Sequence, residues 1–251
     1  MDTATLSGIL AGFGMALAAL LLGPDTATSA HLAGLMFVLG GTCAAILLTF
    51  HAADVQQAAR AGIRAFTARN IPIGEAVTAM MRLAEISHKE GVMALEKIQT
   101  TNPVLQKAVR LVADSADPDV IRDTLSIEIL SLRRRYRSDI AVFSRLAAYA
   151  PVMGMLGTLV GLAQMFAGLK SADALGPGMV TALMATLYGC LLSTLVFLPV
   201  AGRLKTRGRQ EEYRLNIIFE GASCMLENNN PNLVHERLSS FLTPGERAGA
   251  R

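Results

Sequence analysis

The chain has 251 residues, of which 52% are hydrophobic and 17% are charged, with a mean hydropathy of +0.41 and a formal net charge of +3. This composition is typical of membrane proteins and unlike that of soluble domains. The three cysteines, Cys43, Cys190 and Cys224, lie far apart and lack metal-ligand spacing with a histidine, so we expect no disulfide framework, metal site or cofactor. We also expect no enzyme, because the water-facing part has no nucleophile–base pair and no phosphate-binding loop. Nothing in the charge pattern indicates nucleic-acid binding.

Residues 1–50 are predicted to form a transmembrane hairpin. Residues 6–22 are continuously apolar, and no basic leader precedes them, so we interpret them as a retained span and not as a cleaved signal. A short polar loop follows, and residues 32–50 form the second predicted span.

Residues 51–147 are predicted to be a water-facing helical domain, because arginines, lysines and acids recur there on helical spacing. Asn70–Pro72 and Asn102–Pro103 are predicted helix breaks, and Asp117 with Pro118 predicts a new helix start. No breaker follows until Pro151. We therefore expect one long helix running from the cytoplasm into the third span, with roughly 40 Å of it outside lipid.

The third and fourth spans are predicted at about 146–169 and 179–200, so that residues 148–200 form the second membrane segment. Residues 201–251 are predicted to be a cytoplasmic helix ending near Glu227, followed by an unstructured tail. The fold class is thus an all-α integral membrane protein with four transmembrane helices and a helical cytoplasmic domain.

The basic residues set the orientation of these spans. Of 23 Lys and Arg, 14 lie in 51–147, 8 lie after 200, and Lys170 is the remaining one. Cytoplasmic loops are enriched in Lys and Arg, so the large loop, the tail and, with four spans, both termini are predicted to be cytoplasmic.

Small residues form a stripe on each of the last two spans. In the third span Gly154, Gly157 and Gly161 share one helical face, and Thr158 lies beside them. The corresponding residues of the fourth span follow a four- and three-residue spacing: Ala182, Thr186, Gly189 and Ser193. Such stripes are where helices pack in lipid. We expect each to need a facing helix, and because the chain has none to spare we expect an oligomer around helices of a second polypeptide.

Each of these spans also contains a proline near its cytoplasmic end. Pro151 has no N–H to donate to the carbonyl of Ala147, and Pro199 similarly leaves the carbonyl of Leu195 without its usual donor. Both positions are therefore predicted weak points in their helices.

The four predicted spans contain no Asp or Glu and no basic residue deep in the hydrocarbon. A charge at the centre of a span costs about 2.5 to 3.5 kcal/mol on insertion scales, so it is kept only for function. If this chain handles ions, it must use a charged group from another chain and contribute hydroxyls and packing around it.

The run from Pro151 to Leu162, with Gly154, Gly157, Thr158 and Gly161, resembles the pattern shared by MotA, TolQ and ExbB. The segment ATLYG, followed by Ser193–Thr194 and FLPVAGRLK, is similar to the flagellar stator A subunit, MotA/PomA. This resemblance covers nearly the whole chain, in span order and loop lengths as well as in motifs.

The resemblance implies an inner-membrane stator in which five A subunits surround two B subunits, whose spanning helix carries an ion-binding aspartate. Thr186 would line the ion path, Thr158 would face it, and Pro151 and Pro199 would change conformation during ion transit. The alternative for both threonines is a hydroxyl bonded back to its own helix. The ion is Na⁺ or H⁺, and Thr158 favours Na⁺, although Ala185 offers no second hydroxyl beside Thr186.

The stretch SHKEGVMALEKI is where the family engages the rotor protein FliG, and His88, Lys89 and Glu96 fall on those charged positions. His88 stands where arginine is more usual, so its charge depends on pH. The alternative is an ordinary solvated helix. The basic cluster Arg133–Arg137 is interpreted as inter-subunit or membrane-proximal support.

Two other functions stay open at this point. A TolQ- or ExbB-like subunit energising outer-membrane processes would share the third-span motif, but those relatives have three spans with the N-terminus outside. A membrane scaffold without transport would fit the uncharged spans, but it does not account for the paired proline and hydroxyl stripes.

Overall fold

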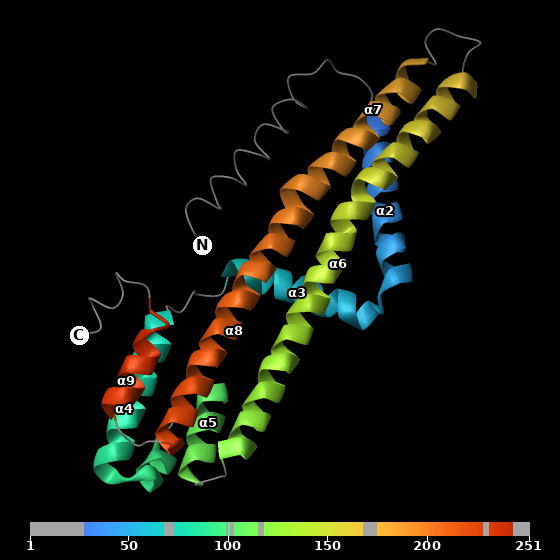
Figure 1. Cartoon of the computed structure of the whole chain (residues 1–251). Helices are drawn as coiled ribbons and strands as arrows, with labels where there is room; N and C mark the ends of the chain where they lie inside the picture. Colours follow the sequence, from blue (N-terminus) through green and yellow to red (C-terminus); the bar gives the residue numbers. More distant parts are fainter. Residues whose placement is uncertain are drawn as a thin grey trace. The chain divides into compact units, whose positions relative to one another are not determined.

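The computed structural model describes residues 28–67, 73–98, 100, 103–114, 118–167, 175–227 and 231–242 (Figure 1). Within these ranges every regular element is a helix. The residues group into two compact units, each assembled from segments distant in the sequence, and we describe each unit by itself. The predicted first span, 6–22, lies outside the described residues.

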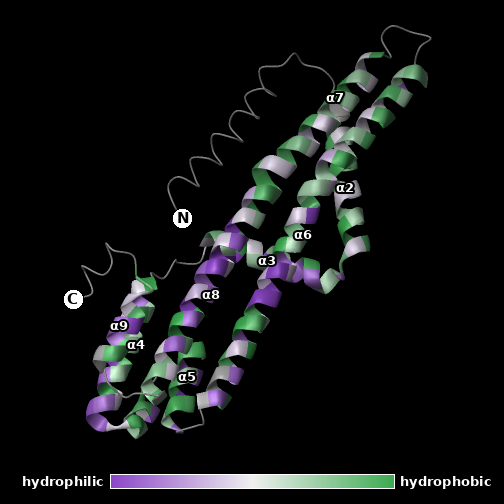
Figure 2. Ribbon diagram, in the orientation of Figure 1, coloured by the Kyte–Doolittle hydropathy of each residue, from purple (hydrophilic) through white to green (hydrophobic). Residues whose placement is uncertain are grey.

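The first unit contains the described apolar helices. Its elements are α2 (Thr28–Thr49), α3 (Ala52–Thr67), α6 (Pro118–Ala167) from Tyr136 onward, α7 (Leu175–Leu191), the π-helical segment η3 (Leu192–Phe197) and α8 (Leu198–Glu227) as far as Lys205. Figure 2 shows hydrophobic residues along α2, α7 and the second half of α6. Three helical stretches among the described residues are long and apolar enough to cross a membrane, in α2, in α6 and in the run from α7 into α8. These stretches, Leu32–Thr49, Asp123–Ala167 and Leu175–Leu226, overlap the predicted spans 32–50, 146–169 and 179–200, whose bounds stay predictions.

Helix α6 is a single helix of 50 residues that continues through Pro151. The sequence predicted this continuity, because Pro118 suits the first helical turn and no breaker follows before Pro151. The predicted starts after the other breaks agree as well, since α4 begins at Ile73 and α5 begins at Pro103.

Helix α3 follows α2 after two residues and packs beside the spans. Its Ala58 is buried in a core with Ile46 of α2 and Val142 of α6. At Gly62 an added Cβ would lie 2.8 Å from the ring of Phe143 and 3.2 Å from Val200, so the glycine permits this close approach. Packing therefore groups α3 with the spans, whereas the sequence interpretation grouped it with the water-facing helices.

The second unit is a helical bundle with its own core. It contains α4 (Ile73–Glu90), the 3₁₀ segment η1 (Val92–Lys97), α5 (Pro103–Ala113), the first part of α6, the later part of α8 and α9 (Pro231–Ser239). Fully buried side chains come from five of these elements: Met80, Leu95, Val109, Ile217 and Leu238. Ion pairs Lys107–Glu128 at 3.1 Å and Arg237–Glu220 at 3.2 Å lie at its surface.

Helix α9 contradicts the prediction that order is lost after Asn228. Its Val234 and Leu238, one turn apart, are buried, and the helix packs on α4. The helix was missed because it follows a run of asparagines and because its buried apolar face consists of only these two residues. The predicted unstructured tail from Thr243 lies outside the described residues.

Candidate functional site

The two small-residue stripes pack against each other. An added Cβ on Gly161 of α6 would lie 2.6 Å from the amide nitrogen of Ala182, and one on Gly189 of α7 would lie 2.6 Å from the carbonyl oxygen of Ala150. An added Cβ on Gly157 would lie 2.5 Å from the Cβ of Ala185. These are mostly backbone contacts, which cannot move aside as a flexible side chain can. We call this contact the α6–α7 seam.

The seam corrects one step of the sequence argument. The stripes were expected to need a helix from another polypeptide, and that reason is wrong, because Gly154 approaches the backbone of Ala185 and Thr186 in the same chain. Sequence reasoning also missed Gly34 of α2, where an added Cβ would lie 3.1 Å from the amide nitrogen of Ala185. It missed Gly178 too, although this residue continues the α7 stripe one turn before Ala182 and could have been found if the helix had been started at Leu175.

The hydroxyl groups of Thr158 and Thr186 donate hydrogen bonds within their own helices. Thr158 Oγ1 donates to the Met155 carbonyl at 2.6 Å, and Thr186 Oγ1 donates to the Ala182 carbonyl at 3.4 Å. Both side chains are partly buried. A hydroxyl that donates in this way keeps two oxygen lone pairs, so it can still accept a hydrogen bond or contact a cation. The back-bond and a position on an ion path are therefore compatible.

Pro151 is bridged from the neighbouring helix. The proline deprives the Ala147 carbonyl of its usual donor one turn along α6, and the Ser193 hydroxyl donates to this carbonyl at 2.7 Å. Ser193 and Ala147 are each only 5% exposed, so water does not take this role. The sequence named Ser193 as a packing residue; the structure shows a hydroxyl that compensates for a proline on the adjacent helix.

A π-helical segment, η3, directly precedes Pro199. Residues 192–197 have the wider π-helical turn, and the Leu198 N–H donates to the Ser193 carbonyl, five residues back. Such segments interrupt α-helices rarely and are often found at functional sites. Ser193 therefore takes part in both irregularities, through its hydroxyl at Pro151 and through its carbonyl at η3.

The predicted rotor-binding residues do not lie on one helix, as the sequence interpretation assumed. His88 and Lys89 lie in the last turn of α4, which ends at Glu90, and Glu96 lies on η1. Gly91 separates them with a φ of 86°, a value that glycine adopts without strain. All three side chains are exposed. They lie in the second unit, and their predicted role stays a prediction.

One arginine of the basic cluster has a partner among the described residues. Arg133 of α6 forms a salt bridge with Glu212 of α8. The hydrogen bond to this carboxylate raises the pKa of the Arg133 guanidinium above its ordinary value. Arg134, Arg135 and Arg137 are exposed.

In sequence and fold the chain is similar to known motility and stator proteins. Residues 96–217 match the MotA/TolQ/ExbB proton channel family. The chain is 32% identical over 248 residues to chemotaxis protein PomA of Vibrio alginolyticus, covering 99% of this chain and 98% of the relative. It is 31% identical to motility protein A of Aquifex aeolicus, covering 96% and 97%. The fold matches a solved chain of the flagellar MotAB stator complex from Bacillus subtilis with a TM-score of 0.87, at 24% identity and 99% coverage of both chains.

Proposed function

Because this chain belongs to the MotA/TolQ/ExbB proton channel family, we propose that it is the A subunit of a flagellar stator, a multi-pass membrane protein that with a B subunit forms an ion channel converting ion flow into torque. The observation that carries this proposal is the α6–α7 seam. At this seam, glycines of the two helices are in close contact, and the hydroxyls of Thr158 and Thr186 lie nearby. Ser193 bonds the carbonyl that Pro151 leaves without a donor, and a π-helical segment precedes Pro199. The described residues of the predicted spans include no Asp or Glu. Such a pair of helices suits movement around an ion site held elsewhere better than passive anchoring.

The ion-binding acid comes from the B subunit in this proposal. The described residues of the spans include no carboxylate, and their hydroxyls and backbone carbonyls do not bind and release a proton at physiological pH. The assembly would contain five copies of this chain around two B subunits in the bacterial inner membrane, with four spans and both termini cytoplasmic. Exposed apolar residues on both seam helices are available for such contacts, among them Met155, Leu159 and Leu183.

Thr158 and Thr186 would contact the passing ion through their oxygen lone pairs, and Pro151 and Pro199 would be the positions that change conformation. Neutral oxygen ligands of this kind can replace water around a cation, which favours Na⁺ over H⁺. His88, Lys89 and Glu96 would engage the rotor protein FliG.

Replacement of Thr186 by valine tests the ion path, since it keeps the side-chain shape and removes the hydroxyl. Ion conductance through the complex with its B subunit should fall severalfold while assembly stays normal. Thr194→Val is the matched control, because its hydroxyl also bonds its own helix, to the Cys190 carbonyl at 2.7 Å, but the side chain is exposed. Unchanged conductance in Thr186→Val would make Thr186 a packing residue.

The choice of ion is tested in swimming cells that depend on this chain. Swimming should stop when sodium is replaced by potassium and should persist when a proton uncoupler is added with sodium present. The opposite pattern would assign the channel to protons and would leave the stator proposal intact.

A further inference from the structure

Helix α3 is fixed at the level where the spans leave the membrane. It begins two residues after α2 ends, and it packs on Phe143, just before the third span, and on Val200, at the end of the fourth. Arg203 of α8 adds two contacts at the same place: its Nε donates to the Ala65 carbonyl at 2.9 Å, and its guanidinium lies 5.1 Å from the ring centroid of Phe66. Three span ends therefore place α3 at the boundary between hydrocarbon and water.

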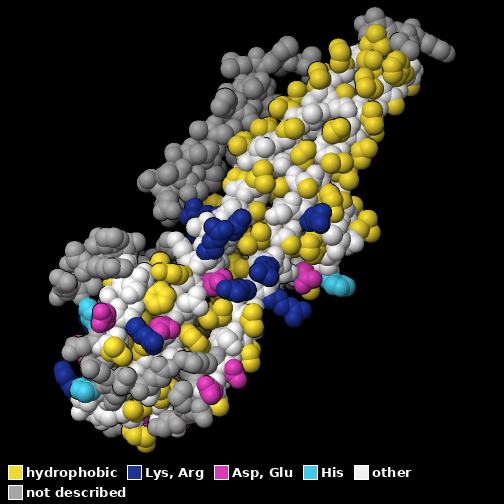
Figure 3. Space-filling view, viewed as in Figure 1, with side chains coloured by type: hydrophobic (Ala, Val, Ile, Leu, Met, Phe, Trp, Pro, Cys, Tyr) yellow, Lys and Arg dark blue, Asp and Glu magenta, His cyan; other side chains and the backbone are white. Residues whose placement is uncertain are grey.

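The face of α3 that turns away from these contacts is basic. Ala58, Gly62 and Ala65 are buried, whereas Arg60 and Arg64, one turn apart, are exposed. Figure 3 shows Lys and Arg side chains gathered where α3 crosses α6 and α8, next to a surface rich in hydrophobic side chains. A helix with an apolar buried face and arginines on the outer face is typical of segments that lie in a membrane interface.

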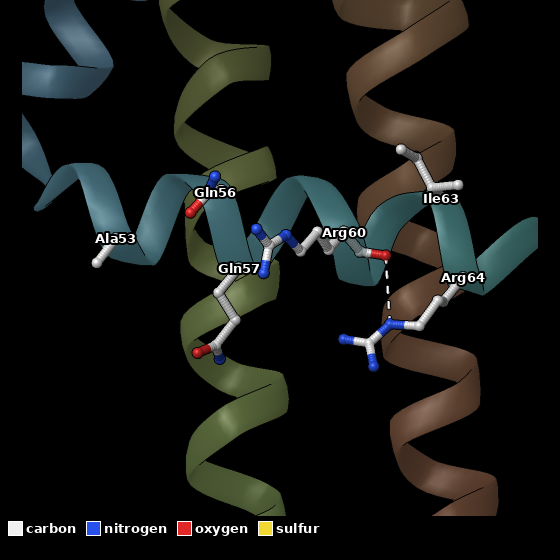
Figure 4. A pocket seen from close by; sticks show the side chains of 6 residues that line it. All are labelled: Ala53, Gln56, Gln57, Arg60, Ile63 and Arg64. Atoms are coloured by element: carbon white, nitrogen blue, oxygen red, sulfur yellow. Dashed lines mark hydrogen bonds between the residues drawn. The ribbon is translucent and has the colours of Figure 1, made fainter.

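A shallow hollow of about 610 Å³ lies along this outer face. It is lined by polar, basic and small apolar side chains of α3 alone: Ala53, Gln56, Gln57, Arg60, Ile63 and Arg64. None of these six described residues carries a carboxylate; the nearby Asp139 accepts a hydrogen bond from Gln57 at 3.5 Å and is buried. In Figure 4, Ile63 projects from one edge of α3 and Arg64 from the other, while Arg60 lies along the helix between them.

We propose that this hollow binds the headgroup of an anionic phospholipid. A phosphodiester matches the hollow in charge and geometry, because guanidinium groups donate paired hydrogen bonds to phosphate oxygens, and the amides of Gln56 and Gln57 can donate to the rest of a glycerol headgroup. Ile63 is 68% exposed and would contact the upper acyl chain. A soluble phosphate has no apolar part to contact Ile63 and does not need a site at the bilayer boundary. Both features therefore favour a lipid as the ligand.

The chain has no tryptophan, and this allows a direct test. Ile63→Trp introduces one fluorophore at the hollow, and the complex with its B subunit is reconstituted into vesicles of brominated phosphatidylglycerol or brominated phosphatidylcholine. Bromine quenches tryptophan only on contact. The parent complex without the substitution supplies the background from any tryptophan of the B subunit.

Both lipids should quench the reporter tryptophan. The association of the hollow with phosphatidylglycerol should be at least about fivefold stronger than with phosphatidylcholine, because each basic residue near a membrane surface contributes about 1 kcal/mol of attraction to anionic lipid. Arg60→Gln with Arg64→Gln should reduce that preference to about onefold. The matched control, Arg134→Gln with Arg135→Gln, removes two exposed charges elsewhere and should keep the preference. A second reporter, Met36→Trp on the exposed side of α2, should be quenched equally by the two lipids and so show no preference for the anionic one.

Three results would overturn the proposal. Absence of quenching by either lipid at Ile63→Trp would mean that protein covers the hollow. Equal quenching by both lipids, or a preference that survives loss of both arginines, would mean that the hollow does not select a headgroup. Loss of the preference in inorganic phosphate, but not in potassium chloride of the same ionic strength, would mean that the site takes free phosphate instead.

Discussion

Ser193→Ala should weaken the α6–α7 seam through the proline on the opposite helix. The substitution removes one oxygen, and because alanine has the higher helix propensity, any destabilisation comes from loss of the hydrogen bond to the Ala147 carbonyl. Because Pro151 has no N–H, this carbonyl then loses the donor that the described residues give it and stays buried.

The expected cost follows from two scales. Hydrogen bonds between helices in membranes contribute about 0.6 kcal/mol on average and at most about 1.7. Leaving a buried acceptor unpaired costs about 1 to 3 kcal/mol. With both partners at 5% exposure, we expect the upper part of the first range, about 1.5 kcal/mol.

Pro151→Ala provides the decisive comparison, because alanine restores the N–H that donates to the Ala147 carbonyl within α6. In the Pro151→Ala protein, Ser193→Ala should lower the free energy of unfolding by less than about 0.5 kcal/mol, compared with about 1.5 kcal/mol in the parent. The difference, about 1 kcal/mol, is the coupling energy between the two sites. The assay is a double-mutant cycle on unfolding of the reconstituted complex, and Thr194→Val is the control for a hydroxyl that bonds only its own helix. If the changes in unfolding free energy from the two substitutions are additive, the Ser193 hydroxyl does not compensate for the N–H that Pro151 lacks.

The other predictions concern packing and the rotor. Gly189→Ala should prevent normal assembly, because its methyl would lie 2.6 Å from the Ala150 carbonyl oxygen, whereas Gly202→Ala, with nothing within 4 Å, should be tolerated; size-exclusion chromatography of the complex compares them. Lys89→Glu and Glu96→Lys should each weaken stator recruitment mildly, at about 0 to 1 kcal/mol, and more when combined, without loss of conductance. Raising the salt should mimic them, because charges are screened beyond about 8 Å at ordinary ionic strength. Loss of conductance with normal recruitment would instead connect these residues to the channel.

Periodicity and helix breakers predicted most of the fold. The long helix from Pro118 was predictable, because a proline start and an uninterrupted pattern leave few alternatives. The three apolar stretches of the described residues were predictable from apolar length, and the first predicted span, 6–22, stays a prediction. The position of α3 was not, since its charge pattern resembles that of a water-facing helix, and only its tertiary contacts at Gly62 show that it packs with the spans.

The seam shows where sequence reasoning reached its limit. The stripes of Gly154 and Gly189 were visible as packing faces, but a stripe does not state which helix it faces, and the interpretation chose a partner outside the chain. Likewise the orphaned carbonyl of Ala147 was predictable from Pro151, while its donor, 46 residues away, was not. Pairings between distant segments depend on register, which composition does not encode.

The π-helical segment η3 has a consequence for every residue that follows it. A segment of this kind places one extra residue in the turn, so the helix beyond it is rotated by about 100° from an unbroken α-helix. The spacing of buried residues reflects this rotation. Before η3, the buried residues Ala182, Ala185 and Gly189 follow the α-helical period. After it, the buried residues Ala201 and Leu204 lie one residue later than the same period would place them. In evolutionary terms η3 is equivalent to a single inserted residue. A chain lacking one residue in 192–197 would regain an unbroken helix and would turn Leu204 out of its buried site.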